Sequence, residues 1–318
     1  MNQTFWPNNK KFCFTIIDDT DNSYLNNAPV IYEYLSKKKI ITTKTVWVRN
    51  GDDSFEYNSV NGTTLENPEY VNWVKKLESQ GFEICLHNMS WSSSSRAQIK
   101  SGFNKFEKLF GRSRVLIQHN DEKECESIYW GSKRLVFPMN IIFEIVSYLN
   151  PRGKRSKIYN GENKKSIYFW GDICKEKVDF IRNFTFPEIN LFNITKNIIH
   201  KRRKTKYVKN WFISTEAPDL KSFVKILNPK NIDKLEKQNG LCIIYTHFGN
   251  NFVKDGKLNE EFKKTIDYLA NKNGWFVPAS EIFDHMKKNR GEPPFLSYFQ
   301  ELKLSIQWLL WKIFKGSS

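Results

Sequence analysis

KFCFTIIDD, residues 11–19, is an apolar run of strand length that ends in two adjacent aspartates. A short, continuous apolar run of this kind is typical of a strand buried on both faces, as in a parallel sheet. Three further runs end in a histidine: FEICLH (82–87), VLIQH (115–119) and CIIYTH (242–247). α/β barrels build their active sites from polar side chains at the carboxyl ends of their strands. The four runs therefore predict one pocket, shared by the aspartate pair and the histidines.

Helical stretches separate the strand-like runs along most of the chain. Helices are predicted at 30–39, 68–81, 95–111 and 258–274, and further strands at 42–50, 167–172, 177–181, 210–215 and 275–280. Strand–helix alternation is the signature of a parallel sheet or barrel. A chain of 318 residues suits one such unit, because α/β barrels run from about 200 to more than 400 residues. We expect an α/β barrel over residues 1–290 and an amphipathic helix over residues 291–318.

The charge of the chain is strongly unbalanced. Lys and Arg number 50 against 34 Asp and Glu, which gives a formal net charge of +16. Such a field favours anionic partners, although abundant lysine can also simply solvate a surface. HKRRKTK (200–206) is either a solvated face or a segment that binds phosphate on a substrate or lipid. The sequence holds no recognisable DNA-reading helix or base-stacking platform, so we expect no specific nucleic acid partner.

Cysteine usage and the termini indicate the compartment. The cysteines are Cys13, Cys85, Cys125, Cys174 and Cys242. They are odd in number and lack CxxC spacing, which is typical of buried thiols in a reducing compartment. The N-terminal segment lacks the pattern of a signal peptide, and the sequence has no run of about 18 apolar residues. We expect a cytoplasmic protein.

The last predicted helix, FLSYFQELKLSIQWLLWKIFK (295–315), gathers tryptophans and aliphatic residues among lysines. A helix of this composition can lie in a membrane interface. It can equally pack across the barrel or against a second subunit, because apolar helical faces usually belong to a core. An interfacial tail with a strong positive charge would place the protein at the inner face of an anionic membrane, acting on a lipid-linked glycan.

In its motifs the chain resembles the polysaccharide deacetylases of the NodB-homology type, which comprise carbohydrate esterase family 4 and its relatives. FTIIDD (14–19) matches the family's strand ending in a paired Asp. GFEICLHNMSW (81–91) matches its motif G-x-E-I-x-x-H-[ST]-x-x-H in part. CIIYTH (242–247), followed by NKNGWFVPASEIF (271–283), matches the last strand-end His and its closure. The resemblance covers roughly residues 10–290 and implies a deformed (β/α)7-8 barrel.

The resemblance also implies roles for single residues. Asp18 would be the catalytic base, and Asp19 and His87 would hold a divalent metal, zinc in the first place. His247 would be the general acid. This chemistry is sound in itself, because a divalent cation with open positions polarises an acyl oxygen and acidifies bound water.

Two departures from the family pattern bear on that metal site. Trp91 stands where the second histidine of the motif is expected, and IQHNDEKE (117–124) replaces an Arg-Pro-Tyr type motif. In one reading His119 supplies the lost imidazole and completes an Asp19, His87 and His119 site. In the other the metal is weakly bound or absent, and the barrel is a non-catalytic or differently catalytic relative.

Candidates for substrate contact are Trp91, Asn120, Tyr129, Trp130 and Asp172. Aromatic rings stack on sugar faces, but they also pack in cores, and Asp172 could instead begin a helix or a turn. Glu216, in WFISTEAPD (211–219), is a further polar group that could approach the pocket. Asp19-Thr20-Asp21 forms the D-x-D with which glycosyltransferases hold a nucleotide sugar, but no Gly-rich phosphate loop accompanies it.

The leading interpretation is a metal-dependent deacetylase-like hydrolase that removes an N- or O-acyl group from a sugar in surface-glycan (LPS or capsule) biosynthesis. Its expected partner is a glycan or a lipid-linked sugar. The rival interpretation is a non-catalytic barrel that binds glycan or scaffolds a biosynthetic complex.

Overall fold

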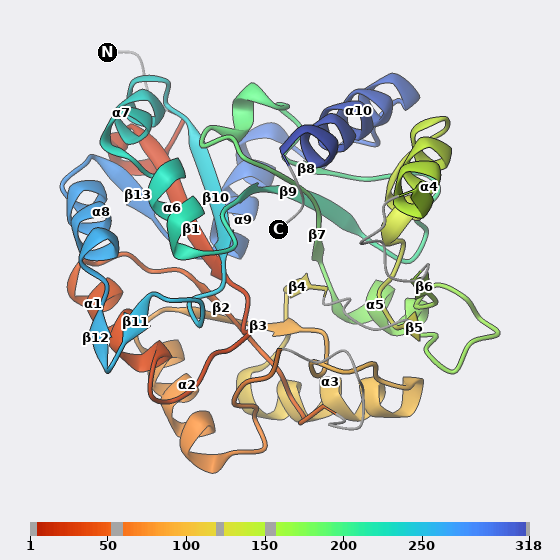
Figure 1. The fold of residues 1–318 in the computed structure, drawn as a ribbon, viewed down its shortest axis with the longest axis horizontal. Helices are drawn as coiled ribbons and strands as arrows, with labels where there is room; N and C mark the ends of the chain where they lie inside the picture. Colours follow the sequence, from red (N-terminus) through yellow and green to blue (C-terminus); the bar gives the residue numbers. More distant parts are fainter. Residues whose placement is uncertain (1–4, 52–59, 119–123, 150–156, 316–318) are drawn as a thin grey trace.

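Seven parallel strands close into a barrel (Figure 1). The computed structural model describes residues 5–51, 60–118, 124–149 and 157–315. The barrel strands are β1 (Phe12–Asp18), β2 (Thr43–Val46), β3 (Glu83–His87), β4 (Val115–Ile117), β7 (Phe180–Phe186), β9 (Asn210–Glu216) and β10 (Leu241–Thr246). They follow one another in this order, and β10 pairs with both β9 and β1 to close the ring. The predicted α/β barrel is confirmed.

Short strands extend or flank the barrel. β13 (Gly274–Phe276) pairs in parallel with β1, and β8 (Ile199–His200) pairs antiparallel with β9. Two small ribbons lie outside the barrel: β5 (Glu124–Cys125) with β6 (Ile158–Tyr159), and β11 (Val253–Lys254) with β12 (Lys257–Leu258). Register is strict along β1, where each residue from 13 to 18 faces one residue of β10.

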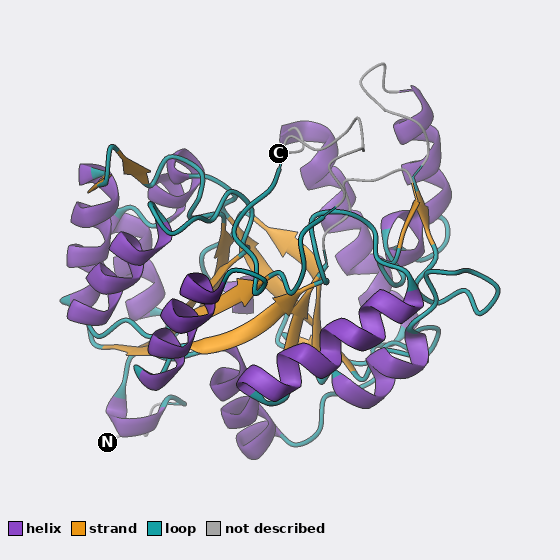
Figure 2. Cartoon of the chain, turned by 90° about the horizontal axis from the view of Figure 1, so that it is seen from below, coloured by secondary structure: helices purple, strands orange, loops and turns teal. Residues whose placement is uncertain are grey.

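Helices cover the outside of the strands (Figure 2). They are α1 (Ala28–Lys37), α2 (Pro68–Ser79), α3 (Arg96–Phe110), α4 (Met139–Leu149), α5 (Gly171–Lys177), α6 (Leu220–Ile226), α7 (Pro229–Lys237), α8 (Glu260–Ala270), α9 (Ala279–Arg290) and α10 (Tyr298–Lys315). Local signals set several of their starts. Asn67 accepts a hydrogen bond from the Tyr70 amide at α2, and Ser95 forms a capping box with Gln98 at α3. Such caps satisfy amides that have no partner within the helix.

The strands separate two apolar cores. Phe14 and Ile16 of β1 pack in the core beneath the helices, whereas Cys13 and Ile17 pack in the second core, which fills the barrel. This alternation follows from the period of two residues along a strand. Asp18, next in the sequence, therefore continues the helix-facing set.

The middle of the chain differs from the sequence-based expectation. The predicted strand at 167–172 is wrong, because residues 164–168 form turns and a bend, and α5 begins at Gly171. The aromatic residues of this stretch serve packing instead: the Trp170 indole donates to the Glu126 carbonyl at 2.6 Å. β7 begins at Phe180 and runs to Phe186, beyond the predicted 177–181. The sequence did not predict α4, α5, α6, α7 or α9.

His200 of β8 yields a prediction about stability. Its ring is fully buried, and burial, aided by the charge of Arg202, lowers its pKa from 6.5 to about 3. Below pH ~6.5 the unfolded chain therefore protonates His200, whereas the folded chain keeps it neutral. The stability of the folded chain is not reduced by this residue above pH ~6.5, and it falls as the pH decreases below that value. When the pH falls from 7 to 5, we expect the free energy of unfolding of the wild type to decrease by about 2 kcal/mol more than that of His200→Gln. Urea unfolding at both pH values measures this; equal losses would contradict it.

Candidate functional site

The carboxyl ends of β1 and β10 are tied together where the predicted aspartates lie. The Asp19 amide donates to the Thr246 carbonyl at 2.9 Å, and the Phe248 amide donates to Asp18 Oδ1 at 3.0 Å. The loops beyond the two strands touch at Gly249, where an added Cβ would collide with the Asp21 and Asn22 carbonyls. Glycine thus permits the loop after β1 to lie directly against the loop after β10.

Asp18 lies behind its strand. Its side chain is fully buried, and Oδ2 accepts hydrogen bonds from the Tyr32 hydroxyl of α1 at 3.0 Å and from Lys44 Nζ of β2 at 2.9 Å. Burial disfavours the charge of Lys44, but the charge and hydrogen bond of Asp18, together with Tyr70 and Asp19, outweigh it and raise the pKa of the ammonium. Asp18 therefore faces the helical layer and not the pocket where the sequence analysis placed it, which disfavours the predicted role of catalytic base.

Asp19 points into the barrel and is held by Arg182. The guanidinium forms two hydrogen bonds with the carboxylate, one from Nη1 to Oδ1 at 3.0 Å and one from Nη2 to Oδ2. Arg182 comes from β7, is buried, and lies 4.3 Å from the centre of the Tyr245 ring. Both oxygens of Asp19 thus already face a fixed cation. This arrangement disfavours the predicted role of Asp19 as a metal ligand.

Asp21 is the carboxylate that joins the two predicted histidines. Its Oδ1 lies 3.3 Å from His87 Nε2, and its Oδ2 lies 3.1 Å from His247 Nε2. His247 Nε2 also lies 3.9 Å from Asp19 Oδ2. The exposed fractions of the side chains are 17% for His247 and 13% for Asp21, against 0% for Asp18. Asp21 and His247 are accordingly the groups that a substrate can approach.

The surroundings of His247 favour its protonated form. Its Nδ1 lies 2.8 Å from the Pro218 carbonyl, which can only accept, so Nδ1 carries a hydrogen. Its Nε2 faces two carboxylates. Burial lowers the pKa of the imidazole, but the charge of Asp21, its hydrogen bond and the charge of Asp19 outweigh burial and raise the pKa to about 9. At neutral pH His247 is a proton donor.

Aromatic side chains wall the site beside His87. The Trp47 ring stacks on His87 with centroids 5.8 Å apart, and Trp91 meets Trp47 edge-on at 5.4 Å. Trp91 is 6% exposed. The residue that replaces the family's second histidine is therefore part of a buried aromatic cluster. Its predicted contact with substrate stays a prediction.

Two other predicted aromatic contacts lie in packed surroundings. Tyr129 stacks on Tyr207 at 6.5 Å, and its backbone amide donates to Glu162. The Arg134 guanidinium covers one face of Trp130 at 3.4 Å from the ring centre. These contacts correspond to the packing alternative that the sequence left open.

Asp172, a predicted substrate contact, is paired with a residue of a neighbouring helix. Asp172 lies in the first turn of α5, where Arg96 of α3 donates two hydrogen bonds of 2.6 Å to its carboxylate. This exposed ion pair accounts for Asp172 without a substrate. His119, the proposed third metal ligand, and Asn120 lie outside the described residues.

The described residues offer an incomplete set of ligands for the metal that the resemblance implies. Within residues 5–51, 60–118, 124–149 and 157–315, no three His, Cys, Asp or Glu side chains are grouped so that they could hold an ion. Asp21 and His87 offer two donors, and Arg182 occupies Asp19. The described residues thus do not fit a closed metal centre.

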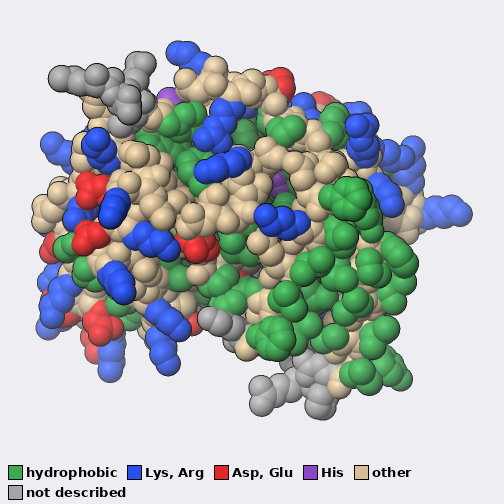
Figure 3. Space-filling view, turned by 90° about the horizontal axis from the view of Figure 1, so that it is seen from above, with side chains coloured by type: hydrophobic (Ala, Val, Ile, Leu, Met, Phe, Trp, Pro, Cys, Tyr) green, Lys and Arg blue, Asp and Glu red, His purple; other side chains and the backbone are tan. Residues whose placement is uncertain are grey.

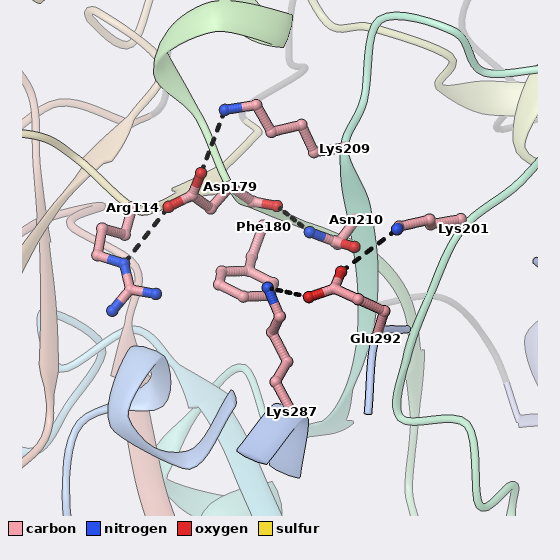
Figure 4. Close-up of a pocket in the computed structure, with 8 residues that line it drawn as sticks. All are labelled: Arg114, Asp179, Phe180, Lys201, Lys209, Asn210, Lys287 and Glu292. Atoms are coloured by element: carbon pink, nitrogen blue, oxygen red, sulfur yellow. Dashed lines mark hydrogen bonds and ion pairs between the residues drawn. The ribbon is translucent and has the colours of Figure 1, made fainter. Parts of the chain in front are cut away.

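A separate cavity lies at the opposite, amino end of the strands (Figure 4). It has a volume of about 320 Å³ and is lined by Arg114, Asp179, Phe180, Lys201, Lys209, Asn210, Lys287 and Glu292. Two of its cations face Asp179 and the other two face Glu292, at 3.0 to 3.4 Å. Each cation therefore has an acidic partner, and the cavity does not adjoin the histidines.

Sequence reasoning missed two cations that organise the site. Lys44 and Arg182 each lie inside a buried strand, and a charged residue in such a strand signals a buried partner. Asp21 was noticed only as the end of a D-x-D. Its pairing with two histidines required the loop geometry beyond β1.

The environment of Asp18 predicts a structural phenotype. Asp18→Asn leaves Lys44 buried without a counter-charge, so we expect a loss of roughly 3–5 kcal/mol of unfolding free energy. Lys44→Met in the same chain should recover part of that loss. The matched control is Asp172→Asn, an exposed pair whose removal should cost less than about 1 kcal/mol. Urea unfolding measures all three; an Asp18→Asn protein of native stability would return Asp18 to the list of candidate bases.

No protein-family model and no curated protein matches this sequence. Solved structures do match the fold. A Pseudomonas aeruginosa PAO1 protein, described as a polysaccharide deacetylase, superposes with a TM-score of 0.50 at 8% identity over 90% of this chain and 94% of its own. The PuuE allantoinase gives 0.49 at 10% identity over 90% and 94%. A Mycobacterium smegmatis protein, also described as a polysaccharide deacetylase, gives 0.45 at 9% identity over 92% and 96%. The chain therefore has the fold of the polysaccharide deacetylase-like barrels.

Proposed function

We propose that the protein is a deacetylase-type hydrolase that removes an N- or O-acyl group from a sugar during the assembly of a surface glycan (LPS or capsule). The observation that carries the proposal is the Asp21–His247 pair, with its 3.1 Å contact, at the carboxyl end of the barrel. Active sites of such barrels lie at this end. The likeness in fold to the Pseudomonas aeruginosa protein described as a polysaccharide deacetylase is consistent with this function.

The residues divide the proton transfers between them. Water attacks the acyl carbon, and Asp21 accepts the proton that the water loses. His247, protonated at Nε2, donates its proton to the departing nitrogen or oxygen, so that a carboxylic acid and a free amine or hydroxyl result. Asp21 takes the role of base in place of Asp18, because it is the accessible carboxylate that contacts His247.

Arg182 and Asp19 support this division. The Arg182 guanidinium compensates the charge of Asp19 inside the barrel. Asp19 lies 3.9 Å from His247 Nε2 and adds to the field that keeps the imidazole protonated. Asp19 and Arg182 act through His247 and are positioning residues.

A divalent metal, zinc in the first place, is a separate proposal. Bound near Asp21 and His87, such an ion would polarise the acyl oxygen. Two donors hold a metal poorly, so a further ligand beyond the described residues is needed, and His119 is the candidate that the sequence offers. No step in the mechanism above passes through the metal.

The rival function is a non-catalytic barrel that binds a glycan or scaffolds a biosynthetic complex. Two observations favour it: Arg182 occupies Asp19, and Trp91 stands in a buried aromatic cluster where a ligand was expected. In either case the substrate or ligand is a glycan or lipid-linked sugar, and we place the protein in the cytoplasm, where its buried, unpaired cysteines stay reduced.

Loss of the proton donor should abolish hydrolysis. We expect His247→Gln and Asp21→Asn each to lower the rate of acetate release by about 10²–10⁴-fold, the range typical of a lost general acid or base. The assay measures acetate released from N- and O-acetylated hexosamines and from 4-nitrophenyl acetate. The matched control is His285→Gln, because His285 of α9 packs against Phe5 and Trp275, away from Asp21.

The same assay distinguishes the two functions. A wild type that releases no acetate, yet binds acetylated oligosaccharides in calorimetry with an affinity that His247→Gln leaves unchanged, would support the non-catalytic barrel. Activity that survives His247→Gln at the wild-type level would overturn the assignment of the acid.

Metal content tests the metal proposal without reference to activity. Elemental analysis of the purified chain after incubation with zinc should find close to one ion per chain, and His87→Ala or His119→Ala should lower that content severalfold. His285→Ala should retain it. A chain that excludes zinc, or a content that is unchanged in both variants, would contradict a metal site at His87.

A further inference from the structure

Exposed apolar side chains are concentrated on α4 and α10. Among the described residues, fourteen of the sixteen large hydrophobic side chains that are exposed lie on these helices or within three residues before them. Leu149 of α4 is 71% exposed, and Phe299 and Phe314 of α10 are each 79% exposed. Figure 3 shows hydrophobic side chains gathered over this side of the molecule, with Lys and Arg along their border. We call the exposed surfaces of α4 and α10 the apolar face.

The two helices are unlike ordinary surface helices. α4, MNIIFEIVSYL, has a single charged residue, Glu144, which accepts a hydrogen bond from the Ser132 hydroxyl at 2.7 Å. α10 is apolar on two sides: Leu304 and Trp308 are buried, while Leu310 and Phe314 are exposed. Soluble monomers rarely leave a contiguous apolar surface of this extent in water, and where they do it marks an interaction site.

The apolar face is built rigidly onto the barrel. Phe143 of α4 lies 5.7 Å from Trp308 of α10, and Trp308 lies 5.8 Å from Phe184 of β7. Lys312 of α10 donates to Glu216, the last residue of β9, at 2.9 Å. α10 thus packs near the carboxyl ends of β7 and β9, the end of the barrel that carries Asp21 and His247.

Cations adjoin the apolar face where α10 begins. The backbone of Lys201 forms an isolated parallel β-bridge with Phe295, three residues before α10. The Arg203 guanidinium lies 5.3 Å from the centre of the Phe295 ring. Arg203 and Lys204 are exposed. The basic run at 200–206 is therefore a border of the apolar face. With a net charge of +16, a second copy of the chain would be repelled, whereas an anionic surface would be attracted.

We propose that the apolar face seats the protein on an anionic lipid bilayer, with the side chains of α4 and α10 in the headgroup and acyl boundary and the exposed Arg203 and Lys204 against lipid phosphates. Apolar burial and attraction to anionic lipids together supply such binding. None of the described helices is long and apolar enough to cross a membrane. The membrane contact expected from the sequence involved the C-terminal helix alone, and the proposed contact also includes α4 and residues 200–206. It does not depend on the proposed reaction.

Co-sedimentation of the full chain with vesicles tests the proposal. We expect binding to vesicles that contain phosphatidylglycerol, weaker binding to pure phosphatidylcholine, and further weakening by salt. Ile145→Ser combined with Phe314→Ser should lower the partition coefficient at least about tenfold, because two large side chains no longer enter the apolar layer. The matched control is Ile167→Ser, an exposed isoleucine (69%) outside both helices.

A charge variant completes the design. Arg203→Gln combined with Lys204→Gln should reduce binding to phosphatidylglycerol vesicles severalfold and leave binding to phosphatidylcholine unchanged. The proposal would be overturned if the wild type did not co-sediment with vesicles. It would also be overturned if the double variant Ile145→Ser and Phe314→Ser bound vesicles as tightly as the wild type. A dimer in sedimentation velocity that the same double substitution dissociates would overturn it too, because a second copy would then occupy the face. Acetate release in detergent-free buffer reports separately on the proposed reaction.

Discussion

The ion pair between Asp19 and Arg182 is the contact on which the arrangement of the site depends. Three aspartates follow one another within four residues at the end of β1, where the barrel excludes water. Buried carboxylates are stable only when they are paired and hydrogen-bonded. The chain supplies Arg182 for Asp19 and Lys44 for Asp18, both from barrel strands. Asp21 is left as the carboxylate that shares its oxygens with histidines.

Strand geometry assigns these roles. Successive side chains on a strand point to opposite sides, and Asp18 at the end of β1 and the adjacent Asp19 turn in different directions. Asp18 meets Tyr32 of α1, and Asp19 meets Arg182 within the barrel. Because β1 and β10 pair residue for residue up to Thr246, the loop that follows Asp19 reaches His247. The position of Asp21 beside His247 is a consequence of that register.

Sequence patterns were sufficient for the barrel but not for the details of the site. The apolar runs that end at Asp18, His87 and His247 are strands in the structure, and the end at which they converge was expected. The aromatic stretch at 167–172 was misjudged, because an apolar run alone does not distinguish a strand from a packed turn. The role of Arg182 could not be read from its neighbours, since its partner lies 163 positions away.

Glu216 connects the end of β9 to the apolar face. Its carboxylate accepts from Thr185 of β7 at 2.6 Å and from Lys312 of α10 at 2.9 Å. One side of α10 therefore completes the core beside β7, and Lys312 pairs with Glu216 instead of facing the solvent alone. The opposite side then carries Leu310 and Phe314 without any need to cover the barrel. A helix that is anchored by a partly buried ion pair and still exposes large apolar groups incurs the cost of hydrating them in water. Burial of these groups in another apolar phase removes that cost, and the anchoring keeps that phase close to the end of the barrel where Asp21 and His247 lie.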